Sequence, residues 1–270
     1  MALLDFLQLD AFQHHRVSVC LMVMKHVLIL SLILGFSPSV FADAGLPEEV
    51  AKHAKGEFRL VFSDDFDRVE SNESKEEVGN GWVTNSQRRA KGAKQVDLVD
   101  SSIVITMAKE ADHGVSVKHD APFRNGIVRA RFQLHDSRGI GFNFNDPKCK
   151  VSHAGHICAL SVKPKKVTFR DGKTGIFDLK IREKKLAGAS KKEISKLTEG
   201  KFAYVDVDLE KERWHEVIIL IQGESMTAWI NGKSVGMLNS PGIGHEVKQN
   251  LAFAVSGRAT VDWVHVWALE

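Results

Sequence analysis

Three side chains that can hold or transfer a proton lie close together in the middle of this 270-residue chain: Asp146, His153 and His156. Histidine titrates near neutral pH and is a common general base, and a carboxylate can orient an imidazole or hold a cation. The two histidines flank Ala154-Gly155, which is typical of a tight turn that a ligand or the backbone can approach closely. These residue types predict a catalytic centre of Asp146, His153 and His156. The alternative is that the two histidines only cap a loop.

A second pair of histidines, His113 and His119, brackets a short apolar alternation at Val115 and Val117. If the two valines face a core, both histidines lie at strand ends near the rim of a sheet. We therefore predict His113 as a further catalytic residue and His119 as a ligand-binding residue. The alternative is that both are rim histidines with ordinary hydrogen-bond partners.

Two asparagines, Asn143 and Asn145, alternate with Phe142 and Phe144. Because side chains alternate across a strand, the amides should face away from a core that contains the phenylalanines. Amides are suited to binding a ligand rich in hydroxyl groups, although plain surface polarity would give the same pattern. The remaining candidates for ligand contact are Trp229, as a stacking platform or as a structural tryptophan, Lys173 in a turn, and His245 in a loop.

Two cysteines, Cys149 and Cys158, enclose the His153–His156 stretch. Their spacing with these histidines, C-x3-H-x2-H-x-C, matches no structural zinc pattern. If the chain is exported, its thiols enter an oxidising compartment. We therefore expect either a disulfide between Cys149 and Cys158 or two unpaired buried thiols, in preference to a zinc cluster.

The first 44 residues are typical of a signal peptide. Ten apolar or small residues, Val27 to Phe36, follow Lys25-His26, and small residues suitable for cleavage end at Ala42 or Ala44. A membrane span would need about 20 apolar residues, and Lys25 interrupts the run. We predict that translation starts at Met24, that the protein is exported to the periplasm or secreted, and that no membrane span remains after cleavage.

The composition is that of an ordinary globular protein. Hydrophobic residues make up 43% and charged residues 26% of the chain, which excludes disordered, collagen-like and multi-span membrane proteins. Lys and Arg number 37 against 34 Asp and Glu, and this near balance gives no support for a nucleic-acid partner.

The elements that must position these residues follow a period of two. Ten or so short strand-like runs alternate with Gly-rich joints, which predicts an all-β fold of two antiparallel sheets packed as a jelly-roll sandwich. One stretch, 183–200, breaks the period and predicts a short helical insertion. We expect a polar lead-in over 45–56 and a single domain over 57–270. The predicted runs are 58–62, 103–107, 115–117, 128–134, 140–144, 158–162, 177–181, 217–221, 226–230, 251–255 and 260–267.

The chain also resembles a known family. The strings WHEV (214–217), WINGKSVG (229–236) and VDWVHVW (261–267) are similar to the concanavalin-like lectin/glucanase jelly roll. Other strings resemble the 3-keto-disaccharide hydrolase domain family more closely: FSDDF (62–66), GNGW (79–82), DHGVSVKH (112–119), GFNFND (141–146), HAGH (153–156) and KTG (173–175). The likeness covers about 57–269. It implies cleavage of glycosides that are already oxidised at the sugar C3.

Such a reaction needs different chemistry from ordinary glycoside hydrolysis. Ordinary hydrolysis uses two carboxylates, and the Glu-x-Asp-x-x-Glu string of jelly-roll glucanases is absent here. A C3 ketone acidifies the C2 hydrogen, so a histidine base can start an elimination that water addition completes. The enolate oxygen needs a divalent metal ion or fixed N–H donors. We predict this hydrolase with a carbohydrate substrate. The alternatives are a non-catalytic glycan-binding module and an envelope interaction domain, which would not need several clustered titratable groups.

Overall fold

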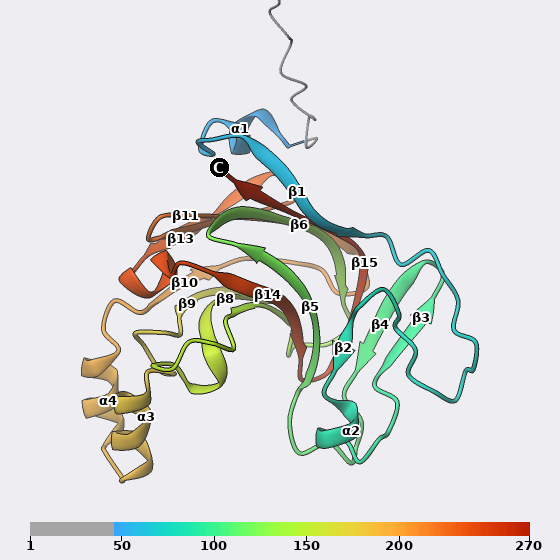
Figure 1. Ribbon diagram of the computed structural model, residues 1–270, viewed down its shortest axis with the longest axis horizontal. Helices are drawn as coiled ribbons and strands as arrows, with labels where there is room; N and C mark the ends of the chain where they lie inside the picture. Colours follow the sequence, from blue (N-terminus) through green and yellow to red (C-terminus); the bar gives the residue numbers. More distant parts are fainter. Residues whose placement is uncertain (1–45) are drawn as a thin grey trace, which may run out of the picture. The chain divides into compact units, whose positions relative to one another are not determined.

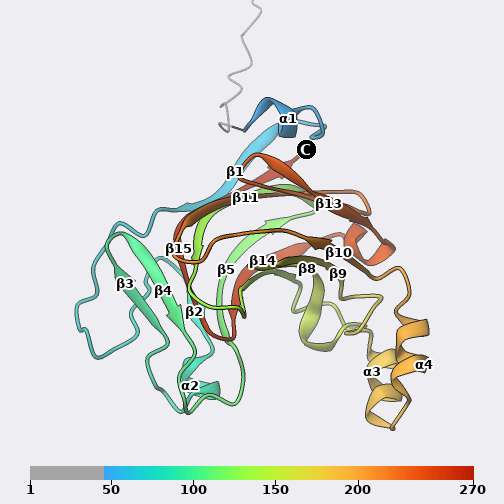
Figure 2. The same ribbon diagram turned by 180° about the vertical axis from the view of Figure 1, so that it is seen from behind.

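A computed structural model describes residues 46–270, and the predicted signal peptide and start codon lie outside this range. The chain in this range forms two antiparallel sheets that pack face to face, as Figures 1 and 2 show from opposite sides. The predicted all-β jelly-roll sandwich is confirmed. No helix in the described range is long and apolar enough to cross a membrane.

The larger sheet has eight strands. Seven of them follow one another across the sheet, and the eighth, β1, pairs with β15. In spatial order its strands are β13 (Lys233–Asn239), β12 (Ser225–Ile230), β11 (Trp214–Gln222), β6 (Asn125–Leu134), β15 (Arg258–Leu269), β4 (Ser102–Thr106) and β3 (Val96–Val99), with β1 (Phe58–Asp64).

The smaller sheet has seven strands, and its open face carries the candidate site described below. In spatial order its strands are β10 (Phe202–Asp206), β9 (Lys166–Asp171), β8 (His156–Lys163), β7 (Ile140–Asn145), β14 (Lys248–Val255), β5 (Val115–Phe123) and β2 (Val83–Thr84).

The core lies between the two sheets because each strand turns its alternate apolar side chains inward. The rings of Phe132 on β6, Phe142 on β7 and Phe253 on β14 meet there edge to face, with centroids 5.9 and 5.7 Å apart. Phe142 and Phe144 are fully buried, and this fixes Asn143 and Asn145 on the opposite, open face of β7.

A second apolar cluster covers the outer face of the larger sheet. Helix α1 (Glu48–Ala51) lies over this face and inserts Val50 against Ile218 and Leu220 of β11. This cover explains why β11 is apolar on both sides. Trp229 belongs to the same cluster, is 1% exposed, and has its ring centroid 5.5 Å from that of His53. The prediction of Trp229 as a sugar-stacking platform is therefore wrong.

The predicted helical insertion is confirmed as two helices, α3 (Leu179–Leu186) and α4 (Lys191–Leu197). It begins earlier than expected, so the strand predicted over 177–181 is wrong. The side chain of Asp178 accepts hydrogen bonds from the backbone N–H groups of Lys180 and Ile181, and this N-cap starts α3.

Both cysteines of the described range are buried and unpaired, so the predicted disulfide is wrong and the alternative of two buried thiols is confirmed. Burial raises the pKa of the Cys158 thiol to about 12, which makes it unreactive. The loop between β7 and β8 is closed instead by backbone contacts, including the Asp146 N–H donating to the Gly155 carbonyl at 2.8 Å.

Candidate functional site

The open face of the smaller sheet has α2 (Ser86–Arg89) at one side and the loop before β8 with α3 at the other (Figures 1 and 2). The residues between them line a groove. Two adjoining hollows of about 580 and 630 Å³ make up this groove. Both hollows are lined by Arg89, His113, His153 and His156, and we use the name groove for the two together. Asn145 lines the first hollow and Asn143 lines the second. The structure thus brings together five of the predicted site residues.

His156 is held in the groove by a chain of two amides. The β7–β8 pairing shifts register after Phe144, and this irregularity sets His156 opposite Asn145. The Nδ1 atom of His156 lies 2.8 Å from Oδ1 of Asn145, and Nδ2 of Asn145 donates to Oδ1 of Asn250 at 3.0 Å. Because the Asn145 oxygen accepts, Nδ1 carries the proton and Nε2 keeps its lone pair.

The environment of His156 keeps the ring neutral. Burial, followed by the nearby Arg170, His153 and His113, lowers the pKa of His156 to about 4. The ring also packs on Phe177, with centroids 4.3 Å apart. At neutral pH the ring is therefore unprotonated and its Nε2 can accept a proton, while the lowered pKa makes it a weaker base than a free histidine.

We expect His156 to make the stability of the protein depend on pH. The unfolded chain binds a proton at its ordinary pKa of 6.5, whereas the folded chain does so only at about 4. His156 therefore contributes about 3 kcal/mol to the free energy of unfolding above pH 6.5. This contribution is lost as the pH falls toward 4. Urea unfolding at pH 7.5 and 4.5 should show a smaller pH difference for His156→Gln than for the wild type. An unchanged difference would contradict the buried neutral state, and His53→Gln in the turn after α1 is the matched control.

His153 and His156 enter the groove through a left-handed turn, η1 (His153–Gly155). Ala154 and Gly155 have φ values of 52° and 69°, so the predicted tight turn is confirmed. A Cβ at Gly155 would lie 2.1 Å from the carbonyl oxygen of Asp146, so only glycine fits here. The backbone N–H of His153 donates to the Phe177 carbonyl at 2.7 Å, which ties the turn to the segment before α3.

Asp146 lies outside the groove, which corrects its predicted role. Its carboxylate is largely buried and accepts from Nε2 of His245 and from the backbone N–H of Lys148, both at 2.9 Å. Burial by itself would raise the pKa of Asp146, but these hydrogen bonds hold it below the usual value. The pair therefore joins the loop after β7 to the segment before β14. His245, also predicted to bind substrate, is used in this contact and does not line the groove.

The predicted pair His113 and His119 separates. His113 lies before β5 and lines both hollows, with Nδ1 donating to the Gly114 carbonyl at 2.9 Å. His119 shares the inward parity of Val115 and Val117, so its ring stacks on Phe62 with centroids 3.6 Å apart. Its prediction as a substrate-binding residue is not supported by this position.

Lys173 does not line the groove either; it lies in the turn after β9, where its backbone N–H donates to the Ile157 carbonyl at 2.9 Å. Arg170 on β9 also lines the second hollow, although it is not among the residues predicted from the sequence. Val167 and Phe169 are fully buried, so the alternation of β9 places Arg170 on the open face. The same period of two could have identified it.

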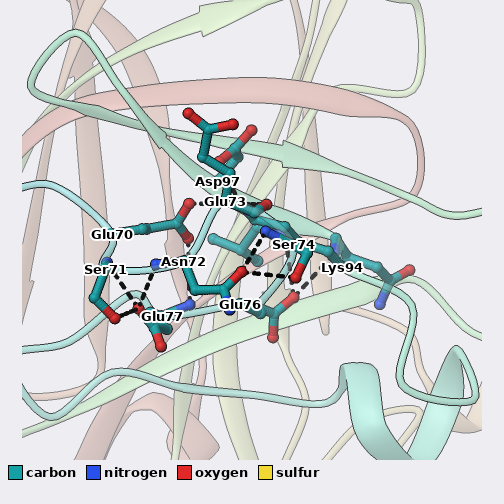
Figure 3. A network of polar contacts seen from close by, with 11 residues as sticks. Glu70, Ser71, Asn72, Glu73, Ser74, Glu76, Glu77, Lys94 and Asp97 are labelled. Carbon is teal, nitrogen blue, oxygen red and sulfur yellow. Dashed lines mark hydrogen bonds and ion pairs between the residues drawn. The ribbon is translucent and has the colours of Figure 1, made fainter.

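The α2 side of the groove is anchored by Glu76, which lies in the long loop before β2 (Figure 3). Its Oε2 atom accepts from Ser86 Oγ at 2.7 Å and from the backbone N–H groups of Gln95 and Val96 at 2.9 and 3.1 Å. These bonds join α2, which carries Arg88 and Arg89, to the start of β3.

Carboxylates are absent from the described lining of the groove. Among residues 46–270, no group of three or more His, Cys, Asp or Glu side chains could hold a metal ion. The groove residues of this range therefore do not fit the divalent ion considered from the sequence. Its polar groups are amides, hydroxyls, imidazoles and cationic side chains.

No protein-family model and no curated protein sequence matches the chain. Solved structures do match. A Flavobacterium laminarinase superposes with a TM-score of 0.50 at 13% identity, over 77% of this chain and 100% of that one. Porphyranase B from Zobellia galactanivorans has a TM-score of 0.50 at 13% identity, over 79% and 93%.

A third match is the GH16 endo-β-1,3(4)-glucanase SCLam, crystallised with an oligosaccharide at its active site. It has a TM-score of 0.51 at 11% identity, over 79% of this chain and 96% of that one. At these identities the likeness concerns the fold. The chain has the concanavalin-like jelly-roll fold that these enzymes share.

Proposed function

We propose that this protein is a carbohydrate-active enzyme that cleaves glycosides oxidised at the sugar C3, with His156 as the general base. One observation carries the proposal. In a groove whose described lining contains no carboxylate, His156 is neutral and is oriented by Asn145 so that Nε2 has a free lone pair. Glycoside cleavage by two carboxylates needs groups that are not found in this described lining.

The reaction balances with the groups present. Nε2 of His156 takes the C2 proton, and the C–H electron pair forms an enolate with the C3 oxygen. Collapse of the enolate forms the C1–C2 double bond and breaks the C1–O bond, and the leaving oxygen takes a proton from the imidazolium or from water. Water then adds to C1 and C2 regains a proton. Arg170 lines the hollow together with His156 and provides N–H donors for the enolate oxygen.

The test is turnover of a 3-keto-glucoside and of the unoxidised glucoside by the purified chain in D2O, with and without EDTA. We expect release from the keto sugar alone, unaffected by EDTA, with deuterium at C2 of the product. Direct hydrolysis would leave the C2 hydrogen in place and would reject the base role of His156. Absence of release from either sugar, across several linkages, would favour a non-catalytic glycan-binding module.

A further inference from the structure

Cationic side chains gather around the groove. Within residues 46–270, its lining includes seven Arg or Lys residues and no Asp or Glu, although the whole chain has 37 of the former and 34 of the latter. The imbalance is therefore local and does not follow from the composition. The seven are Arg88, Arg89, Lys118, Arg138, Lys163, Arg170 and Arg182.

Most of these charges have no carboxylate of the described chain as a partner. Arg89 pairs with Asp112 and Arg138 with Asp136, each at 3.3 Å, and the other five form no ion pair within residues 46–270. On the larger sheet, by contrast, Arg129 pairs with Glu216 at 2.9 Å and Arg131 with Asp262 at 2.8 Å. The groove thus keeps an excess of positive charge directed at a ligand.

Arg170 is partly buried on the floor of the groove. Its guanidinium lies 5.0 Å from the centroid of the Phe177 ring, and its Nε is buried without a hydrogen-bond partner in the described range. A partly buried guanidinium without a counterion is costly, and an anionic group bound beside it would offset that cost. Arg170 shares the second hollow with His156, so this position is close to the proposed reacting sugar.

The charges are spread along the groove. Arg88 and Arg89 lie on α2, Lys118 on β5, and Arg182 on α3, so a ligand meets them on both sides and on the floor. Each hollow is within the size range of small-molecule sites. A chain with anionic groups on successive sugars would match this spread better than a single charged sugar.

We propose that the groove binds an anionic glycan, one whose sugars carry carboxylate or sulfate groups. A nucleic acid would also supply negative charge, but single strands bind on aromatic platforms. Phe177 is the only Phe, Tyr or Trp lining the groove within residues 46–270, and its ring is packed against His156 and Arg170. The inference names the substrate class of the proposed function, but binding can be measured without turnover.

The experiment is calorimetric titration of the purified chain with four oligosaccharides of equal length. Oligogalacturonate is compared with its neutral methyl ester, and a carrageenan oligosaccharide with its neutral agarose counterpart. We expect binding of at least one anionic member, about 10-fold or more tighter than its neutral partner, and weakening with added salt. The two pairs distinguish carboxylate from sulfate.

Substitutions of groove arginines test whether the anionic glycan binds in the groove. Arg170→Gln and Arg182→Gln should each weaken the anionic glycan by about 10-fold to 100-fold. Lys191→Gln on α4, outside the groove, is the matched control and should bind as the wild type does. Arg182 lies on α3, a helix with no buried residue, so its variant still tests the proposal if Arg170→Gln does not fold.

Three results would overturn the inference: equal affinity for charged and neutral members of both pairs, equal loss in the control variant, or tighter binding of a single-stranded oligonucleotide at the same salt. Anionic binding without turnover of any keto sugar would keep this inference and reject the proposed catalysis. Turnover of a neutral keto-glycoside, with no preference for an anionic one, would support the proposed catalysis and reject the anionic-glycan inference.

Discussion

We expect His156→Gln to reduce turnover of a 3-keto-glycoside by about 10²-fold to 10⁴-fold, the usual contribution of a general base. Glutamine can still donate to Asn145 Oδ1 in place of Nδ1, but it provides no lone pair of comparable basicity for the C2 proton. Steady-state kinetics at pH 7 should show the loss in kcat, with KM within a few-fold of the wild type. The deuterium content at C2 of any remaining product should fall in parallel.

Two further variants distinguish the role of His156 as the base from the role of Asn145, which orients it. Asn145→Ala removes the partner of Nδ1, so we expect a smaller loss of kcat than for His156→Gln and a changed pH profile. His53, in the turn after α1, lies against Trp229 of the other sheet, so His53→Gln should leave kcat unchanged. A kcat of His156→Gln within threefold of the wild type would remove His156 from the mechanism.

We expect Asp64→Ala to lower the free energy of unfolding by about 3–5 kcal/mol, as is usual when one partner of a buried ion pair is removed. Asp64 ends β1, and its side chain is only 2% exposed. It accepts from both terminal nitrogens of Arg68 at 2.7 and 3.0 Å, from Trp82 Nε1 at 2.7 Å, from Asn80 at 2.9 Å, and from the Phe66 N–H at 2.8 Å. Its loss leaves all these donors without an acceptor.

Urea unfolding at pH 7 measures this loss. Asp208→Ala is the control, because its pair with Lys165 is exposed and surface pairs contribute at most about 1 kcal/mol. Burial would raise the pKa of Asp64, but hydrogen bonds from Arg68 and Asn80 hold it below its usual value. Asp64 therefore stabilises the fold fully at a pH above the pKa that its carboxyl has in the unfolded chain. This stabilisation is lost as the pH falls through the lower pKa of the folded state. A loss below 1 kcal/mol for Asp64→Ala would contradict this account.

The sequence indicated the fold because its main signal is local. Alternation on β7 assigned Phe142 and Phe144 to the core and the two asparagines to the open face, and no knowledge of neighbouring strands was needed. The small residues before His156 likewise indicated a tight turn. The alternation rule wrongly predicted a strand over 177–181. There the side chain of Asp178 caps the first backbone N–H groups of α3, so the segment forms a helix although its apolar residues alternate.

The tertiary structure decided which polar groups meet. Asp146 is close to His156 in sequence, yet its partner is His245, because the β7–β8 loop packs against the segment before β14. Trp229 has an ordinary strand position, but α1 covers that face of its sheet. Such contacts depend on strand order and on which face is covered, and neither is encoded in local spacing.

By itself, the sequence determined the two-sheet architecture, the open-face asparagines and the turn that carries His153 and His156. Only the tertiary structure showed two buried free thiols, the Asn250–Asn145–His156 chain and a groove whose cationic residues come from separate strands and helices. The physical reason is that side-chain alternation acts over a few residues, whereas a binding groove forms from segments that pairing and packing bring together across the whole chain.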